Sequence, residues 1–123
     1  MDLIYAQIEL INAGSADVQP IIVRALADTC EMLLRIPQHI ATKLRLERQD
    51  TRPVRLVDGT LAEVDYVGPI QVRFDGRSCF IGAVVVGDDV LLGAMPMEDM
   101  DLVIDPALRR VRGANPDGSR GRA

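Results

Sequence analysis

Few side chains in this 123-residue chain could do chemistry. His39 is the single histidine, so it builds no metal cluster, and no Gly-x-Ser-x-Gly turn supplies a serine nucleophile for it. Lys43 is the single lysine, and no glycine-rich phosphate-binding loop is present. Cys30 and Cys79 form no Cys-x-x-Cys pair. These residue types therefore indicate neither a metal cluster nor a phosphate-binding loop.

The remaining candidate is a carboxylate, Asp28, which Thr29 follows at the end of the apolar stretch 21–27. A carboxyl group held among apolar strands is a candidate for acid–base chemistry. The structural alternative is a turn in which Asp28 accepts hydrogen bonds from nearby backbone N–H groups. The dipeptide alone leaves both interpretations open.

Short strands must position this dipeptide, because alternation of apolar and polar residues dominates the chain. Asp58-Gly59 and Asp75-Gly76 are strong turn signals between alternating segments. Pro37 and the apolar spacing after it predict a short helix, and residues 96–100 suit one or two helical turns. Residues 47–53 are charged, and Gly68-Pro69 separates two strands. Strands are predicted over residues 4–10, 21–27, 33–36, 54–57, 61–66, 70–74, 79–86, 90–93 and 102–104. The pattern predicts a compact β-barrel or sandwich with little helix.

Composition limits the class of protein further. Hydrophobic residues make up 48% of the chain and aromatics only 3%, which predicts one domain with an aliphatic core. A net charge of −4 argues against a nucleic-acid partner. We expect a domain over residues 1–112 and a disordered basic tail over residues 113–123. Without a signal peptide or a membrane-length apolar run, we expect a cytoplasmic protein with no membrane partner.

The order of the segments resembles that of retropepsin-like (clan AA, retroviral-type) aspartic proteases in their short bacterial form. The resemblance covers roughly Leu3 to Val111. Residues 24–29 look like the strand that delivers a catalytic Asp-Thr-Gly, and residues 36–44 like the segment that follows it. Residues 56–60 take the place of the flap, residues 90–93 look like an apolar-apolar-Gly motif, and residues 96–101 resemble the C-terminal helix.

The resemblance implies an all-β fold: a small closed β-barrel of the acid-protease type, with one or two short helices, assembled as a homodimer. The resemblance makes Asp28 and Thr29 catalytic, implies a peptide or protein substrate, and implies that no metal or organic cofactor is needed. The flap and substrate-binding residues would be Val57, Asp58, Gly59 and Thr60. The residues beneath the active site would be Leu91, Leu92 and Gly93.

A single Asp-Thr motif implies that each of two subunits gives one Asp28, since 123 residues cannot hold two lobes. The two carboxyls would share one proton, as in the known aspartic proteases. One would act as general base on a water, and the other would polarise the scissile carbonyl. Thr29 would join the two loops by hydrogen bonds.

The chain departs from the family at Cys30, where the motif has glycine, and at Glu31, where it has a small residue. Glycine there permits a tight turn and a close approach of the substrate. Three interpretations stay open. The first is a homodimeric aspartic endopeptidase with an Asp28–Asp28 dyad. The second is a catalytically degenerate dimer that binds peptides or partners, and the third is an unrelated small barrel in which Asp28 is structural.

Overall fold

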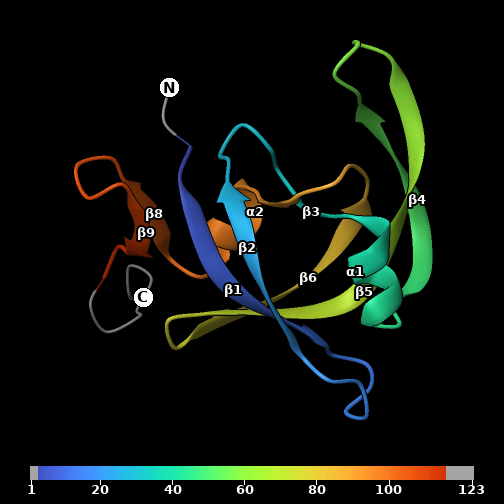
Figure 1. Ribbon diagram of the computed structural model, residues 1–123, viewed down its shortest axis with the longest axis horizontal. Helices are drawn as coiled ribbons and strands as arrows, with labels where there is room; N and C mark the ends of the chain where they lie inside the picture. Colours follow the sequence, from blue (N-terminus) through green and yellow to red (C-terminus); the bar gives the residue numbers. More distant parts are fainter. Residues whose placement is uncertain (1–2, 116–123) are drawn as a thin grey trace.

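A closed barrel forms the body of the molecule in the computed structural model, which describes residues 3–115 (Figure 1). Around the barrel run β1 (Tyr5–Asn12), β2 (Ile21–Ala27), β7 (Val90–Leu92), β3 (Leu34–Ile36), β6 (Arg77–Val85) and β5 (Leu61–Phe74). A pairing between β1 and β5 closes the ring of these six described strands. Most neighbours are antiparallel, whereas β2–β7 and β3–β6 are parallel. The predicted closed β-barrel is confirmed.

A long hairpin, made of β4 (Glu47–Arg55) and the start of β5, projects from the barrel (Figure 1). Within residues 3–115, β4 pairs only with β5. We call residues 47–65 the flap hairpin. The turn at Asp58-Gly59 is confirmed, but the strand over residues 47–53 was missed because almost all of its side chains are exposed and show no alternation.

The predicted break at Gly68-Pro69 is wrong, because β5 runs through it to Phe74. The Gly68–Pro69 peptide is cis, and the β5–β6 register shifts between Val67 and Ile70. The strand thus passes the proline by an irregularity in its pairing, which is a usual way for a sheet to accept proline. The Pro69 carbonyl accepts a hydrogen bond of 3.0 Å from the Ala13 N–H.

The two short helices of the described chain are α1 (Gln38–Lys43) and α2 (Ala94–Asp99), as the sequence predicts. After α2, β8 (Leu102–Asp105) pairs with β9 (Arg110–Gly113) in a separate two-stranded sheet. The β9 strand was not predicted, and it ends at the first residue of the predicted tail. Residues 116–123 of that tail lie outside the described residues.

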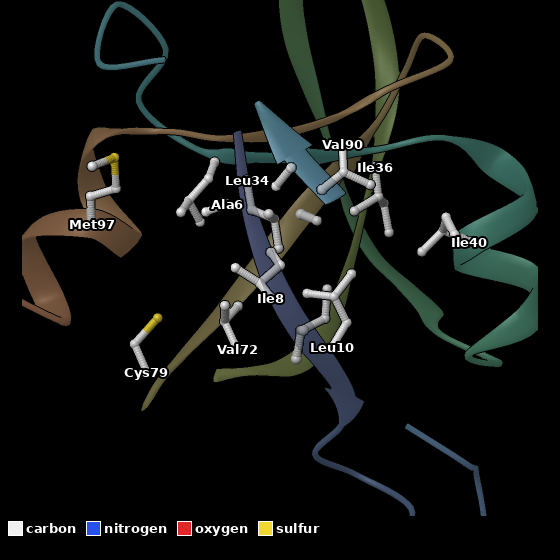
Figure 2. Packing of buried hydrophobic residues seen from close by; sticks show 14 of the residues in the cluster. Ala6, Ile8, Leu10, Leu34, Ile36, Ile40, Val72, Cys79, Val90 and Met97 are labelled. Atoms are coloured by element: carbon white, nitrogen blue, oxygen red, sulfur yellow. The ribbon is translucent and has the colours of Figure 1, made fainter. Parts of the chain in front are cut away.

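The core is aliphatic, as the composition predicts. Ile8 and Leu10 of β1 and Leu34 and Ile36 of β3 are fully buried and point into one interior (Figure 2). Each such side chain contributes about 1.5–3 kcal/mol through burial. No helix among the described residues is long and apolar enough to cross a bilayer.

Candidate active site

Asp28 is the first residue after β2, and its backbone is fixed from two sides. The Ala27 N–H donates to the Ile4 carbonyl at 2.9 Å, and the Asp28 N–H donates to the Leu92 carbonyl at 3.0 Å. The apolar strand β2 is held between β1 and β7, so the sheet carries this carboxylate to a defined place.

Residues 28–33, which we call the Asp28 loop, begin with a tight turn. The Cys30 N–H donates to the Asp28 Oδ1 at 3.0 Å, and the Glu31 N–H donates to the Asp28 carbonyl at 3.1 Å. Asp28 is half-buried, whereas Thr29 and Cys30 are exposed. The turn predicted as the structural alternative is therefore present, and it leaves the Thr29 hydroxyl at the surface.

Gly93 lies directly beneath this loop, and the backbone of the loop leaves no room for a side chain at this position. A Cβ there would lie 2.8 Å from the Glu31 carbonyl oxygen and closer still to that of Leu33. The next two residues tie the loop to α2, because the Ala94 N–H donates to the Glu31 carbonyl at 2.7 Å and the Met95 N–H to the Met32 carbonyl at 2.9 Å. The structure thus brings the predicted Leu92-Gly93 pair against the Asp28 loop.

Glu31 does not stand as a free third carboxylate beside Asp28. Its carboxylate lies 2.9 Å from the Arg35 guanidinium of β3. Both side chains are partly shielded, with 30% of Glu31 and 18% of Arg35 exposed. Sequence reasoning missed this pair, although the spacing of four residues between opposite charges was a visible signal.

The backbone at Cys30 needs no glycine for its own conformation. Among residues 3–115, the non-glycine residues with positive φ are Arg45, Asp75, Asp101 and Arg109. Cys30 therefore has an ordinary backbone, and its side chain reaches solvent. Within a single copy of the chain, a cysteine side chain therefore fits at position 30.

A small hollow of about 250 Å³ opens beside Asp28. Its walls are mostly apolar and come from the N-terminal segment, the end of β2 and β8. The lining residues are Leu3, Ile4, Leu26, Ala27, Asp28, Thr29, Cys30 and Ile104. Sequence reasoning missed Ile4 and Ile104 as site residues. Their apolar pattern predicts strands, but it does not indicate which strands come together in the fold.

The predicted flap residues lie at the tip of the flap hairpin. Asp58 Oδ1 accepts hydrogen bonds from the Thr60 N–H at 2.9 Å and the Thr60 Oγ1 at 2.6 Å, and these lower the Asp58 pKa. Gly59 has a φ of 88° and suits this turn. Val57 is fully exposed. The tip and the Asp28 loop rise from the same end of the barrel, at the top of Figure 1, but Val57–Thr60 do not line the hollow at Asp28.

A larger hollow, of about 520 Å³, lies along β1 and the β5–β6 turn. Gln7, Glu9, Arg73 and Asp75 are among its lining residues, and Asp28 is not. Volume alone makes no active site, and this open surface mixes both signs of charge. We therefore place the candidate site at Asp28, where a carboxylate and backbone constraints converge.

Comparison with known proteins gives a likeness in structure only. No protein-family model matches the chain, and no curated protein matches its sequence. The retroviral protease-like domain of Ddi1 from Leishmania major matches with a TM-score of 0.61 and 14% identity, over 94% of this chain and 90% of that one. The protease of Simian Foamy Virus (mac) matches with a TM-score of 0.50 and 14% identity, over 74% of this chain and 90% of that one.

Proposed function

Because the chain has the retropepsin-like fold, we propose that it is a homodimeric aspartic endopeptidase whose active site joins the Asp28 residues of two copies. The observation that carries the proposal is the position of Asp28. Asp28 is a half-buried residue whose backbone bonds to Leu92 of β7 and whose neighbour Ala27 bonds to Ile4, at the end of the barrel from which the flap hairpin rises. The protein would act in the cytoplasm, where Cys30 stays reduced.

The chemistry requires two Asp28 carboxyls that share one proton, because two close carboxylates do not both ionise readily. The ionised carboxyl takes a proton from a water as its oxygen attacks the scissile carbonyl. The protonated carboxyl donates its proton to that carbonyl oxygen. Collapse of the tetrahedral intermediate then breaks the C–N bond: the amine leaves with the proton that the first carboxyl took from water, and a hydroxyl of the intermediate returns a proton to the second carboxyl.

Exposed groups around Asp28 suit a two-fold contact. Leu3 is 60% exposed and Met32 59%, and both flank the site. The half-buried Ile4 and Ile104 form apolar walls of the hollow. A second copy would cover these side chains, and the Thr29 hydroxyl is free to bond across the axis. Burial of apolar surface at about 25 cal/mol per Å² would supply most of the association energy.

The flap hairpin would close over an extended peptide. Val57 and Leu61 stand exposed on either side of the Asp58-Gly59 turn, so apolar side chains are available at its tip. Strand-like main-chain pairing with the substrate would supply affinity, and pockets for alternate side chains would supply specificity. Flaps of this kind also exclude water from the reaction.

A second candidate function is peptide or partner binding without catalysis, and Cys30 is the observation that favours it. Cys30 follows Asp28 by two residues and has an exposed side chain. In the proposed dimer two such thiols would lie near the shared proton, where the water and the peptide must fit. The fold and the dimer would then survive while hydrolysis is lost.

The test uses the full chain with a mixed peptide library, with cleavage followed by mass spectrometry and oligomeric state by sedimentation. We expect a dimer that cleaves peptides, and Asp28→Asn should abolish cleavage while circular dichroism stays unchanged. Asp88→Asn, in an exposed turn, is the matched control and should cleave normally.

Each other outcome selects a different answer. A dimer that cleaves nothing supports the binding function. A strict monomer that still cleaves peptides would exclude the shared dyad, and an Asp28→Asn variant that fails to fold would assign Asp28 a structural role.

A further inference from the structure

The flap hairpin leaves the barrel at one residue, Tyr66. The β5–β6 pairing begins where Tyr66 faces Val84 and continues to Phe74. Before Tyr66, the described residues of β5 pair only with β4. Any change in the angle of the flap hairpin must therefore occur close to Tyr66.

The Tyr66 ring lies close against the neighbouring strand because β6 has a glycine there. A Cβ at Gly82 would lie 2.6 Å from Cε2 and 2.5 Å from Oη of Tyr66. Real side-chain carbons do not approach that closely, so Gly82 is what lets the ring cross from β5 onto β6. The φ of Gly82 is not positive, and its role is space alone.

The ring also contacts β4, the partner strand of β5 in the flap hairpin. The Arg52 guanidinium carbon lies 4.4 Å from the centroid of the Tyr66 ring, which is cation–π geometry. Arg52 Nε also lies 3.9 Å from the Asp50 carboxylate of the same strand. The Tyr66 ring, carried on β5, thus contacts both β6 and β4, and it joins both flap strands to the barrel.

We propose that Tyr66 is a positioning residue that sets the angle of the flap hairpin through its clamped ring. This inference rests on the proposed function insofar as the flap closes on a peptide. Tyr66 lies on the hinge and not at the flap tip, so it acts through the position of Val57–Thr60 and not by contact with the reacting atoms.

The chain offers a matched control for this contact. The Arg24 guanidinium carbon lies 3.6 Å from the Tyr5 ring centroid, on the paired strands β1 and β2. Tyr5 is 37% exposed, and its strand, β1, does not pair with β4 or with residues 61–65 of β5. Loss of this second ring removes the same kind of contact without touching the hinge.

The experiment measures hydrogen exchange of backbone amides in residues 47–66 of the full chain. Tyr66→Leu should speed their exchange about two- to five-fold, the range that matches one exposed cation–π contact. Tyr66→Phe keeps the ring and should exchange like wild type. Tyr5→Leu should leave the exchange of these amides unchanged.

Gly82→Ala should also speed flap exchange, because the new methyl group displaces the ring. In the background of Tyr66→Leu, Gly82→Ala should add little, since no ring remains to displace. With a cleaved peptide, Tyr66→Leu should raise KM about two- to five-fold with a smaller change in kcat.

Equal flap exchange in Tyr66→Leu and Tyr5→Leu would overturn the proposal, as would a Tyr66→Phe variant that behaves like Tyr66→Leu. Additive effects of Gly82→Ala and Tyr66→Leu would overturn it as well. Because exchange needs no substrate, a chain that cleaves nothing refutes the endopeptidase alone and leaves this test of the hinge intact.

Discussion

The Asp28 loop and the flap hairpin are two surface segments at one end of the same barrel, and they are held in opposite ways. The Asp28 loop is bonded through its backbone to β7 and α2, and Gly93 brings these backbones into close contact. The flap hairpin has a long exposed ladder between its own two strands and, among residues 3–115, pairs with the barrel only at its base.

This difference in bonding suits the proposed function, in which the reacting carboxylate needs a fixed position and the substrate-binding segment must move. A carboxylate that must meet a second copy needs a fixed position, because catalysis falls steeply with misplacement of about 1 Å. A segment that closes on a peptide must open again, and such segments come from the least stable parts of a fold.

The largest expected effect is a loss of stability when glycine is replaced by alanine, and the same substitution in each region compares how tightly the two are packed. Gly93→Ala should destabilise the protein by about 3 kcal/mol, because the methyl group meets backbone oxygens that cannot turn away. Gly59→Ala meets no atom within 4 Å, and its cost of about 1–2 kcal/mol comes from its φ of 88°. Chemical denaturation of both variants measures the difference. Equal losses would mean that the Asp28 loop is no more constrained than the flap tip.

The sequence predicts correctly those elements whose own residues determine their structure. A nearly continuous apolar stretch indicated β2, and Asp58-Gly59 indicated the turn of the flap hairpin. The charged strand Glu47–Arg55 has no such pattern, because it packs against no core and is ordered by its partner strand. The β9 strand was missed because Val111 is the one buried residue of its four, which is too few to show an alternating pattern.

The candidate site shows the same limit. Asp28 and the Leu92-Gly93 pair were identified from the order of motifs, and the structure brings them together. Ile4 and Ile104 reach the site from strands far apart in the chain. Such convergence depends on the topology of the barrel, and no single segment of sequence encodes it.

A second expected effect concerns Cys30, which the structure gives an ordinary backbone. If the thiol crowds the shared water in the dimer, Cys30→Gly should raise peptide cleavage about ten- to hundred-fold. The variant should lose about 0.5–1 kcal/mol of stability, because glycine adds chain entropy and no strained φ is relieved. Parallel assays of cleavage and thermal unfolding measure both.

The other cysteine supplies the control for this test. Burial, and then the charge of Asp99, raise the pKa of Cys79 to about 12, so its thiol stays neutral and unreactive near pH 8. Iodoacetamide should therefore modify Cys30, stop cleavage by the wild type and leave Cys30→Gly active. Equal inhibition of both proteins would place the sensitive group elsewhere.

The smallest expected effect lies at the flap tip, where purely local bonds hold the turn. The Thr60 hydroxyl is the main cause of the lowered Asp58 pKa, so Thr60→Val should raise that pKa toward its ordinary value of 3.8. A lowered pKa stabilises the turn above pH 3.8, and this support is lost as the pH falls through the folded value. Carboxyl chemical shifts followed over an acid titration measure the change.

Asp105 is the control residue for that titration, because its pKa is lowered by Arg112 and not by Thr60. Its titration should be the same in wild type and Thr60→Val, and so should the exchange of amides in the Asp28 loop. A tip substitution that altered the Asp28 loop would show that the two regions are coupled within one chain, and the contrast between a fixed loop and an independent flap would fail.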